Sequence, residues 1–141
     1  ETILKKREGY REAFDQFDSK KISKYTAFKI EALLQNSNIV RNKLKVNSIV
    51  LNARLFLEVQ KEFGSFDKYI WQFTDGKTIQ NRYRKMADLP ANTAESDAMS
   101  QALKKCGFKF IGTTICYAFM QAVGMVNDHT TDCFRYKECA V

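Results

Sequence analysis

The stretch LKKCGFKFIGTTICYAFMQAVG, residues 103–124, decides the fold, because it contains two helical segments joined by a short turn with two glycines. The first helix is expected to end near Cys106, since Gly107 supplies the positive φ that a helix C-terminus often needs. The second helix begins at Thr113 and is almost wholly apolar to about Val123. The stretch therefore predicts a helical hairpin whose turn runs from Gly107 to Gly112.

The start of the second helix is a candidate anion site. Its first backbone N–H groups have no partner within the helix, and the helix dipole is positive there. Gly112 has no side chain, so a DNA phosphate could approach the backbone closely. This is the design of a helix-hairpin-helix DNA-binding element; the alternative is an ordinary helical hairpin with a glycine turn. The residues expected to contact DNA are Lys105, Gly107, Lys109, Gly112, Thr113 and Thr114, beside Lys104.

Hydrophobic periodicity predicts further helices on the N-terminal side of the hairpin. We expect an amphipathic helix over Thr2–Phe17, one or two short helices over Lys20–Asn36, the longest helix over Arg41–Phe63, and a short helix capped by Ser65 that continues to Phe73. Thr93 has the character of an N-cap for the first helix of the hairpin. No stretch alternates as a β-strand does, so the chain is predicted to be one all-α domain.

Helical spacing also predicts which side chains face the core. On the longest helix the expected stripe is Leu44, Leu51, Leu55 and Val59, and it is widened by Ile49, Ala53, Phe56 and Phe63. On the short helices before it, Ile22, Phe28, Ile30, Leu33 and Leu34 are expected to face inward. The uncharged stretch Phe110–Asn127 is long enough for a membrane span, and a fully buried core helix is the preferred interpretation.

Composition limits the class of protein. The chain has 141 residues with 45% hydrophobic residues, which fits a globular domain and excludes a disordered chain. Its net charge of +7 favours a polyanionic partner such as nucleic acid. The four cysteines form no C-x-x-C pair, and Glu1–Arg7 does not have the pattern of a signal peptide. We therefore expect a cytoplasmic protein.

Several motifs resemble the DNA-3-methyladenine glycosylase I family. The segment Lys104–His129, which ends in Gly-Met-Val-Asn-Asp-His, is similar to the C-terminal signature of that family. Segments Thr2–Asp18, Asn38–Lys43 and Ile49–Arg54 also resemble family segments and occur in the same order. The resemblance implies the helix-hairpin-helix DNA glycosylase fold as a single helical domain over residues 1–141, with the DNA-binding element at about residues 95–124. It also implies an N-terminally truncated chain, because the family continues upstream of Thr2.

The resemblance implies an activity and a partner. The family flips a methylated adenine out of double-stranded DNA and hydrolyses its N-glycosidic bond in base-excision repair. We expect alkylated double-stranded DNA as the partner, a monomeric state and no membrane. The family's glutamate and tryptophan that recognise the base lie upstream of Thr2, so this chain is expected to be deficient in base release. A non-catalytic DNA-binding module is the alternative, and a helical domain without a DNA role is a third.

The catalytic group within this chain is unknown at this point. The resemblance places Tyr117 and Ala118 at the wall of the base pocket, where the family often has Ser in place of Ala118. A core tyrosine with a satisfied hydroxyl is an equal alternative for Tyr117. Asp128 and Asp132 lie after the second helix, where related glycosylases outside this family have a catalytic Asp, which this family lacks. Asp128 is the weak candidate for an acid, although solvated loop carboxylates are the preferred interpretation of both residues.

The C-terminal tail, residues 127–141, contains a candidate zinc pair. An imidazole and a thiolate at the spacing His129-x-x-x-Cys133 can converge on one zinc ion. The resemblance strengthens this interpretation, because the family joins its two termini through one structural zinc. It implies that half of the site, a Cys and a His, comes from the missing N-terminal segment. Cys139 is a possible third ligand.

Overall fold

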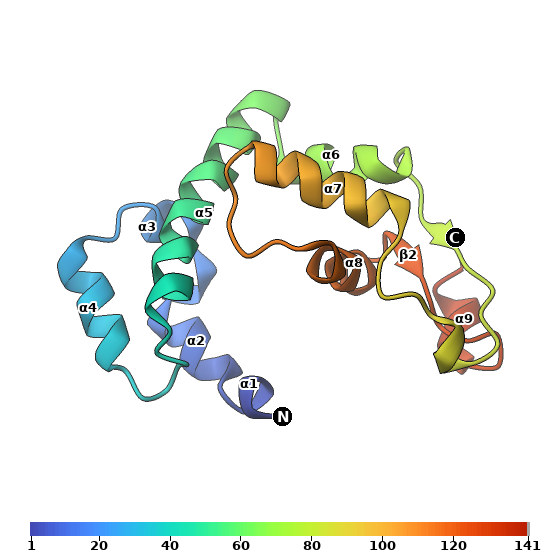
Figure 1. Ribbon diagram of the computed structural model, residues 1–141, viewed down its shortest axis with the longest axis horizontal. Coiled ribbons are helices and arrows are strands. Elements are labelled where there is room, and N and C mark those ends of the chain that lie inside the picture. The colour runs from blue at the N-terminus through green and yellow to red at the C-terminus, as the bar shows by residue number, and fades with distance from the viewer. Residues whose placement is uncertain (141) are drawn as a thin grey trace. The chain divides into compact units, whose positions relative to one another are not determined.

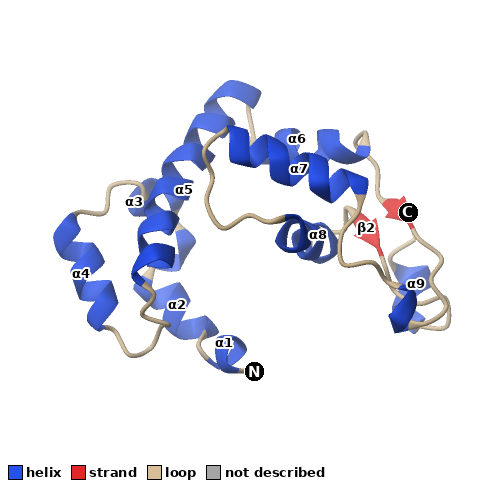
Figure 2. Cartoon of the chain, viewed as in Figure 1, coloured by secondary structure: helices blue, strands red, loops and turns tan. Residues whose placement is uncertain are grey.

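The computed structural model describes residues 1–140, in which helices dominate (Figure 2). The prediction of an all-α fold is confirmed for these residues, apart from one short pair of strands. Contacts divide the chain into two compact units: Glu1–Gly64 with the segment Gly107–Phe110, and Ser65–Cys106 with the described residues from Ile111 onward. No helix in the described range is long and apolar enough to cross a membrane.

The first unit is built around α5 (Lys43–Phe63), against which α3 (Ser19–Ile22) and α4 (Ala27–Gln35) pack (Figure 1). Side-chain oxygens cap the first turn of all three helices and so fix where each begins. The capping residues are Asp18, Thr26 and Asn42. Gly64, with φ of 83°, ends α5 as the sequence predicts. The long helix and the two short ones are thus confirmed.

The buried face of α5 agrees only in part with the predicted face. Val59 and Ala53 are buried as predicted, and so are Val46 and Val50, which were not predicted, while Leu44 and Leu51 are 72% and 38% exposed. Both sets of residues have the spacing of a helix face, and packing against α3 and α4 determines which of them is buried. Phe28 on α4 was also expected to face inward, and this was wrong because it is 85% exposed.

The predicted continuous helix over Thr2–Phe17 is interrupted. The structure has α1 (Thr2–Lys5), α2 (Arg7–Ala13) and a 3-10 turn, η1 (Asp15–Phe17), whose three residues have φ between 51° and 59°. A left-handed conformation costs about 1–2 kcal/mol for each residue other than glycine. Packing around Phe14 offsets this cost, because Phe14 is fully buried and stacks on Tyr25, whose hydroxyl donates a hydrogen bond to Asp15.

The second unit contains both helices of the predicted hairpin. After α6 (Phe66–Trp71), η2 (Gln72–Thr74) and η3 (Met86–Asp88) come α7 (Ala94–Lys105) and α8 (Thr113–Ala122), which lie side by side (Figure 1). The side chains of Ser65 and Thr93 cap α6 and α7, and this confirms both predicted caps.

The prediction that α8 is fully buried was wrong. Cys116, Tyr117 and Met120 are buried on one face of the helix. The other face carries apolar side chains that are substantially exposed: Ile115 at 57%, Phe119 at 38% and Val123 at 43%. The apolar character of residues 113–123 therefore predicts a helix correctly and does not predict burial on all sides.

The second unit also contains a pair of parallel strands that the sequence did not predict, β1 (Ile79–Gln80) and β2 (Val126–Asn127). Two residues are too few for a visible alternation of apolar and polar positions. The C-terminal tail includes one further helix, α9 (Phe134–Glu138). Residue 141, the last of the predicted zinc tail, lies outside the described residues.

Candidate functional site

The turn of the predicted hairpin is fixed to α5 within the first unit. Asn52 donates a hydrogen bond from Nδ2 to the carbonyl oxygen of Lys109 (3.0 Å) and accepts one at Oδ1 from the Lys109 backbone N–H (2.9 Å). Gly107 has φ of 99°, which confirms the expected positive φ, and Phe110 also has a positive φ of 57°. Phe108 is buried between them. The Lys109 side chain remains exposed on a main chain that is held at a defined position.

The start of α8 is fixed by α7 within the second unit. Buried Ser96 shares a hydrogen bond of 2.8 Å with the hydroxyl of Thr113, and buried Ser100 donates one of 2.7 Å to the carbonyl oxygen of Ile111. Gly112 is the N-cap, and no side chain caps the first N–H groups of α8. These backbone donors are therefore available to an anion, as the sequence predicts.

Among residues 1–140 no contact or backbone angle requires glycine at position 112. Its φ of −66° and ψ of 162° suit any residue, and a Cβ built at this position would meet no atom within 4 Å. The first unit provides a contrast at Gly9, where a Cβ would lie 2.5 Å from the carbonyl oxygen of Asn38. The backbone at Gly112 is therefore open to close approach, in contrast to that at Gly9.

Asp128 lies at the centre of a polar cluster in the second unit. Its Oδ2 accepts hydrogen bonds from the Tyr117 hydroxyl (2.5 Å) and from Gln121 Nε2 (2.7 Å), and its Oδ1 accepts one from Asn81 Nδ2 (2.7 Å). The carboxylate is only 9% exposed. The interpretation of Asp128 as a solvated loop carboxylate is therefore wrong. Asp132 is exposed, as that interpretation expects.

The two residues assigned to the base pocket lie in different surroundings. Tyr117 is 2% exposed, and burial followed by the hydrogen bond to Asp128 raises the pKa of its phenol above the ordinary value. These properties match the core tyrosine with a satisfied hydroxyl. Ala118 is exposed, because consecutive helical residues point about 100° apart. The structure does not bring the two side chains together, and a role for either in a base pocket stays a prediction.

The predicted zinc pair is close in space. The Sγ of Cys133 and the Nδ1 of His129 are 3.7 Å apart. Zinc bonds of about 2.0 Å to nitrogen and 2.3 Å to sulfur, at a tetrahedral angle, separate the two ligand atoms by about 3.5 Å. The pair therefore fits two ligands of one zinc ion. Within residues 1–140 no group of three or more His, Cys, Asp or Glu side chains could hold a metal, so Cys139 does not complete the site.

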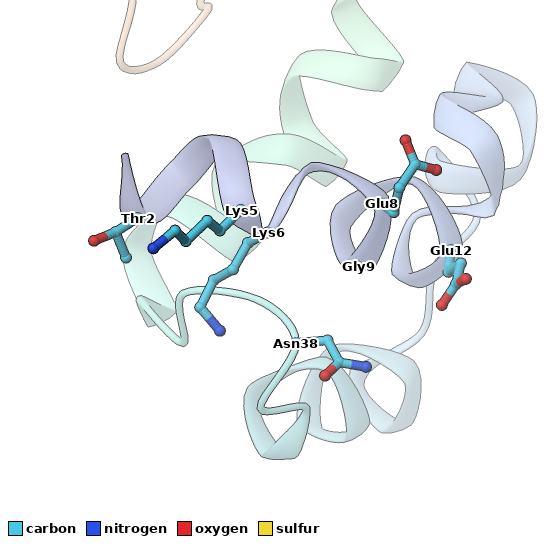
Figure 3. Close-up of a pocket in the computed structure, with 7 residues that line it drawn as sticks. All are labelled: Thr2, Lys5, Lys6, Glu8, Gly9, Glu12 and Asn38. Carbon is cyan, nitrogen blue, oxygen red and sulfur yellow. The ribbon is translucent and has the colours of Figure 1, made fainter.

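A cavity of about 280 Å³ adjoins the zinc pair, and its lining includes Asp128, His129 and Cys133. A larger groove of about 440 Å³ lies in the first unit around α1 and α2 (Figure 3). Lys5 and Lys6 lie toward one end of that groove, and Glu8 and Glu12 lie toward the other. This groove was not predicted from the sequence, and its mixed charges select no class of ligand.

Sequence reasoning missed the residues that hold the hairpin and the Asp128 cluster in place. These residues are Asn52, Ser96, Ser100, Asn81 and Gln121. For Asn52, Ser96 and Ser100 the available signal was their position inside helices, because Asn and Ser are poor helix formers unless their side chains have other partners. The identity of those partners could not be inferred, since most of them lie 11 or more residues away in the sequence.

Comparisons with known proteins place the chain in one family. A family model described as methyladenine glycosylase matches residues 1–136. The DNA-3-methyladenine glycosylase of Haemophilus influenzae is 51% identical over 132 residues, which cover 94% of this chain and 71% of that protein. DNA-3-methyladenine glycosylase 1 of Escherichia coli K12 is 43% identical over 135 residues, which cover 96% of this chain and 72% of that protein.

Solved structures agree with these matches. A crystal structure of 3-methyladenine DNA glycosylase I superposes with a TM-score of 0.90 at 47% identity, covering 94% of this chain and 73% of that one. A variant of 3-methyladenine DNA glycosylase I in complex with 3-methyladenine has a TM-score of 0.91 at 35% identity, with 94% and 72% covered. A family model over nearly the whole chain, close relatives and matching folds lead to one conclusion: this chain belongs to the methyladenine glycosylase family.

Proposed function

We propose that this protein is a DNA glycosylase that removes 3-methyladenine from alkylated double-stranded DNA. The observation that carries the proposal is the 51% identity to the Haemophilus influenzae enzyme across 94% of the chain. In the reaction, the oxygen of water bonds to C1′ of the deoxyribose and its extra proton passes to solvent, while the bond from C1′ to the base nitrogen breaks and its electron pair goes to the base. A methylated adenine is cationic and leaves as a neutral base, so positioning contributes more than strong acid catalysis.

The hairpin is proposed to bind the DNA backbone as a helix-hairpin-helix element. The exposed start of α8 offers uncapped N–H groups, and Gly112 leaves room for a phosphate. Lys105 and Lys109 are exposed near it in sequence. The charge distribution supports this assignment, because the unit that holds the hairpin turn has 14 of the 23 basic and 8 of the 16 acidic residues. Its net charge is thus +6 of the total +7.

Asp128 is proposed to have a structural role and not to activate water. Its carboxylate accepts three hydrogen bonds from neutral donors on α8 and on the segment after β1, which use three of the roughly four acceptor positions of a carboxylate. A buried carboxylate held by three donors has little capacity left to take a proton from an attacking water. The cluster instead joins Asn81 to Tyr117 and Gln121, and so fixes the loop that carries His129.

A second proposal is that His129 and Cys133 bind one structural zinc ion together with further ligands from the complete protein. The distance of 3.7 Å between their ligand atoms supports it. Bound zinc would stabilise the tail and take no part in bond cleavage. His129→Ala and Cys133→Ser should each lower zinc content and melting temperature, whereas the matched control Cys139→Ser should change neither. Equal zinc content in all three variants would contradict the proposal.

The protein is further proposed to act as a cytoplasmic monomer. The four cysteines are all free, as expected in a reducing compartment. A single enzyme molecule suffices for one flipped base, because the proposed chemistry needs one pocket. Sedimentation of the protein alone and bound to duplex DNA measures the oligomeric state, and a dimer in either sample would contradict this part of the proposal.

The decisive experiment measures release of free 3-methyladenine from DNA treated with a methylating agent, using protein expressed from its complete gene. Release should exceed the rate of spontaneous depurination in a sample without protein by orders of magnitude. Lys105→Glu combined with Lys109→Glu should reduce release at limiting DNA concentration through weaker binding. DNA binding without any release would favour the non-catalytic DNA-binding module.

A further inference from the structure

The side chain of Asn52 satisfies both backbone groups of a residue 57 positions later in the chain. Its Nδ2 donates to the Lys109 carbonyl oxygen at 3.0 Å, and its Oδ1 accepts from the Lys109 N–H at 2.9 Å. Both residues belong to the same compact unit. Because the two hydrogen bonds reach the N–H and the C=O of the same residue, they fix both the orientation of the Lys109 main chain and its distance from α5.

The segment around Lys109 needs this support. Gly107 and Phe110 both have positive φ, so the residues between them cannot pair their backbone groups as a helix or strand would. Leu55, one turn along α5 from Asn52, would lie 3.5 Å from a Cβ at Gly107, and buried Phe108 anchors the segment by its side chain. Within residues 1–140 the side chain of Asn52 forms both hydrogen bonds to the Lys109 main chain.

Asn47, another asparagine on α5, provides a comparison, because its side chain bonds only within the helix. Asn47 is exposed, and its Nδ2 donates to the carbonyl oxygen of Lys43, four residues earlier in α5. That bond is local to the helix. Asn52 is half-buried and directs both ends of its amide away from α5 to the hairpin turn. Asparagine is a poor residue for a helix interior, so its partner outside the helix gives position 52 a physical reason to be Asn.

We propose that Asn52 is a positioning residue for DNA binding, which fixes the hairpin turn so that Lys109 meets a DNA phosphate. The proposal rests on the function proposed above and extends it to a residue that contacts no DNA. A lysine on a mobile turn must lose main-chain freedom when it binds, whereas a lysine on a fixed turn has already lost it. Releasing the turn should therefore weaken binding by roughly three- to tenfold near 0.1 M salt and leave the slope of log K against log salt unchanged, because Lys109 still neutralises its phosphate once bound. Removing the charge in Lys109→Gln should instead lower that slope by about one.

The test is a double-mutant cycle measured by duplex DNA binding over a series of salt concentrations. The variants are Asn52→Ala, Lys109→Gln and their combination, with Asn47→Ala as the matched control. Amide hydrogen exchange at Lys109 reports directly on the bond. We expect faster exchange at Lys109 and weaker binding in Asn52→Ala, no change in Asn47→Ala, and a double variant that binds no more weakly than Lys109→Gln. Should Asn52→Ala be unstable, the isosteric Asn52→Asp replaces it, with Asn47→Asp matching its added charge.

The possible outcomes separate the two proposals. Weaker binding in Lys109→Gln with normal binding in Asn52→Ala overturns the role of Asn52 and leaves the DNA interface intact. Additive losses in the double variant also overturn it, because Asn52 would then act on something other than Lys109. Normal binding in both single variants removes the hairpin turn from the interface and overturns this inference together with the proposed DNA-binding mode.

Discussion

The hydroxyl of Tyr117 donates a hydrogen bond of 2.5 Å to the carboxylate of Asp128, and both side chains are buried. A buried carboxylate is costly unless donors surround it, and here all three donors are neutral. The Tyr117 hydroxyl is therefore important for folding.

Tyr117→Phe should lower the free energy of unfolding by about 1–3 kcal/mol, because Asp128 loses a donor that water cannot easily replace. Urea denaturation followed by circular dichroism measures the change. Tyr25→Phe is a matched control, since its hydroxyl also donates to a carboxylate, that of Asp15, at a more exposed place. The Tyr25→Phe variant should lose less stability. An equal or greater loss would show that burial of the Tyr117–Asp128 hydrogen bond does not increase its contribution to the free energy of unfolding.

Stability should fall above pH of about 10. The folded structure raises the pKa of Tyr117 above its ordinary value of 10.0, mainly through burial and then through the hydrogen bond to Asp128. The pKa of Tyr25 is raised in the same way. A raised pKa in the folded state means that the stabilisation is complete below the unfolded pKa and is lost as the unfolded chain ionises. Urea midpoints between pH 8 and 11 should decline less steeply in Tyr117→Phe than in the unaltered protein; parallel curves would refute this assignment.

Ser100→Ala should weaken DNA binding as well as stability. It removes the donor to the Ile111 carbonyl at 2.7 Å and so loosens the start of α8, at a cost of about 1 kcal/mol. Ser48→Ala is the matched control, because Ser48 is also buried and donates to a main-chain carbonyl, that of Lys45, at 2.7 Å. Both variants should melt at lower temperature, and only Ser100→Ala should bind duplex DNA more weakly. Equal binding by the two would show that the start of α8 needs no support from Ser100.

Gly112→Val should fold normally and bind DNA poorly. The backbone angles at Gly112 suit valine, and no atom lies within 4 Å of the new Cβ. The added side chain would instead keep a phosphate away from the backbone N–H groups. Gly107→Val provides the contrast, since its φ of 99° strains any side chain and should lower the melting temperature. Unchanged DNA affinity in Gly112→Val would mean that no phosphate approaches this glycine.

Helix caps and helix ends could be predicted from the sequence, but the side of a helix that is buried could not. The caps at Ser65 and Thr93 and the end of α5 at Gly64 depend on neighbouring residues only, so they were predicted correctly. The core face of α5 depends on which neighbours pack against it, and Leu44 and Leu51 fit the periodicity as well as the buried residues do.

The candidate site shows the same division. The glycines of the hairpin and the pair His129–Cys133 are short-range patterns, and the structure places the ligand atoms of the pair 3.7 Å apart. The surroundings of Asp128 depend on Asn81, 47 residues away, and so its burial was not foreseen. Because hydrogen bonds between distant residues leave no periodic trace in the sequence, Asn52 could not be connected with Lys109.

The hydrogen bonds that hold the hairpin have a consequence for how the protein leaves DNA. Asn52 binds the Lys109 main chain and Ser100 binds the Ile111 carbonyl through neutral groups only. Dissolved ions screen charges and have little effect on neutral hydrogen bonds. A rise in ionic strength should therefore detach the protein from phosphates while the hairpin keeps its shape. Released molecules would be ready to bind again at once, without a refolding step between successive encounters with the genome.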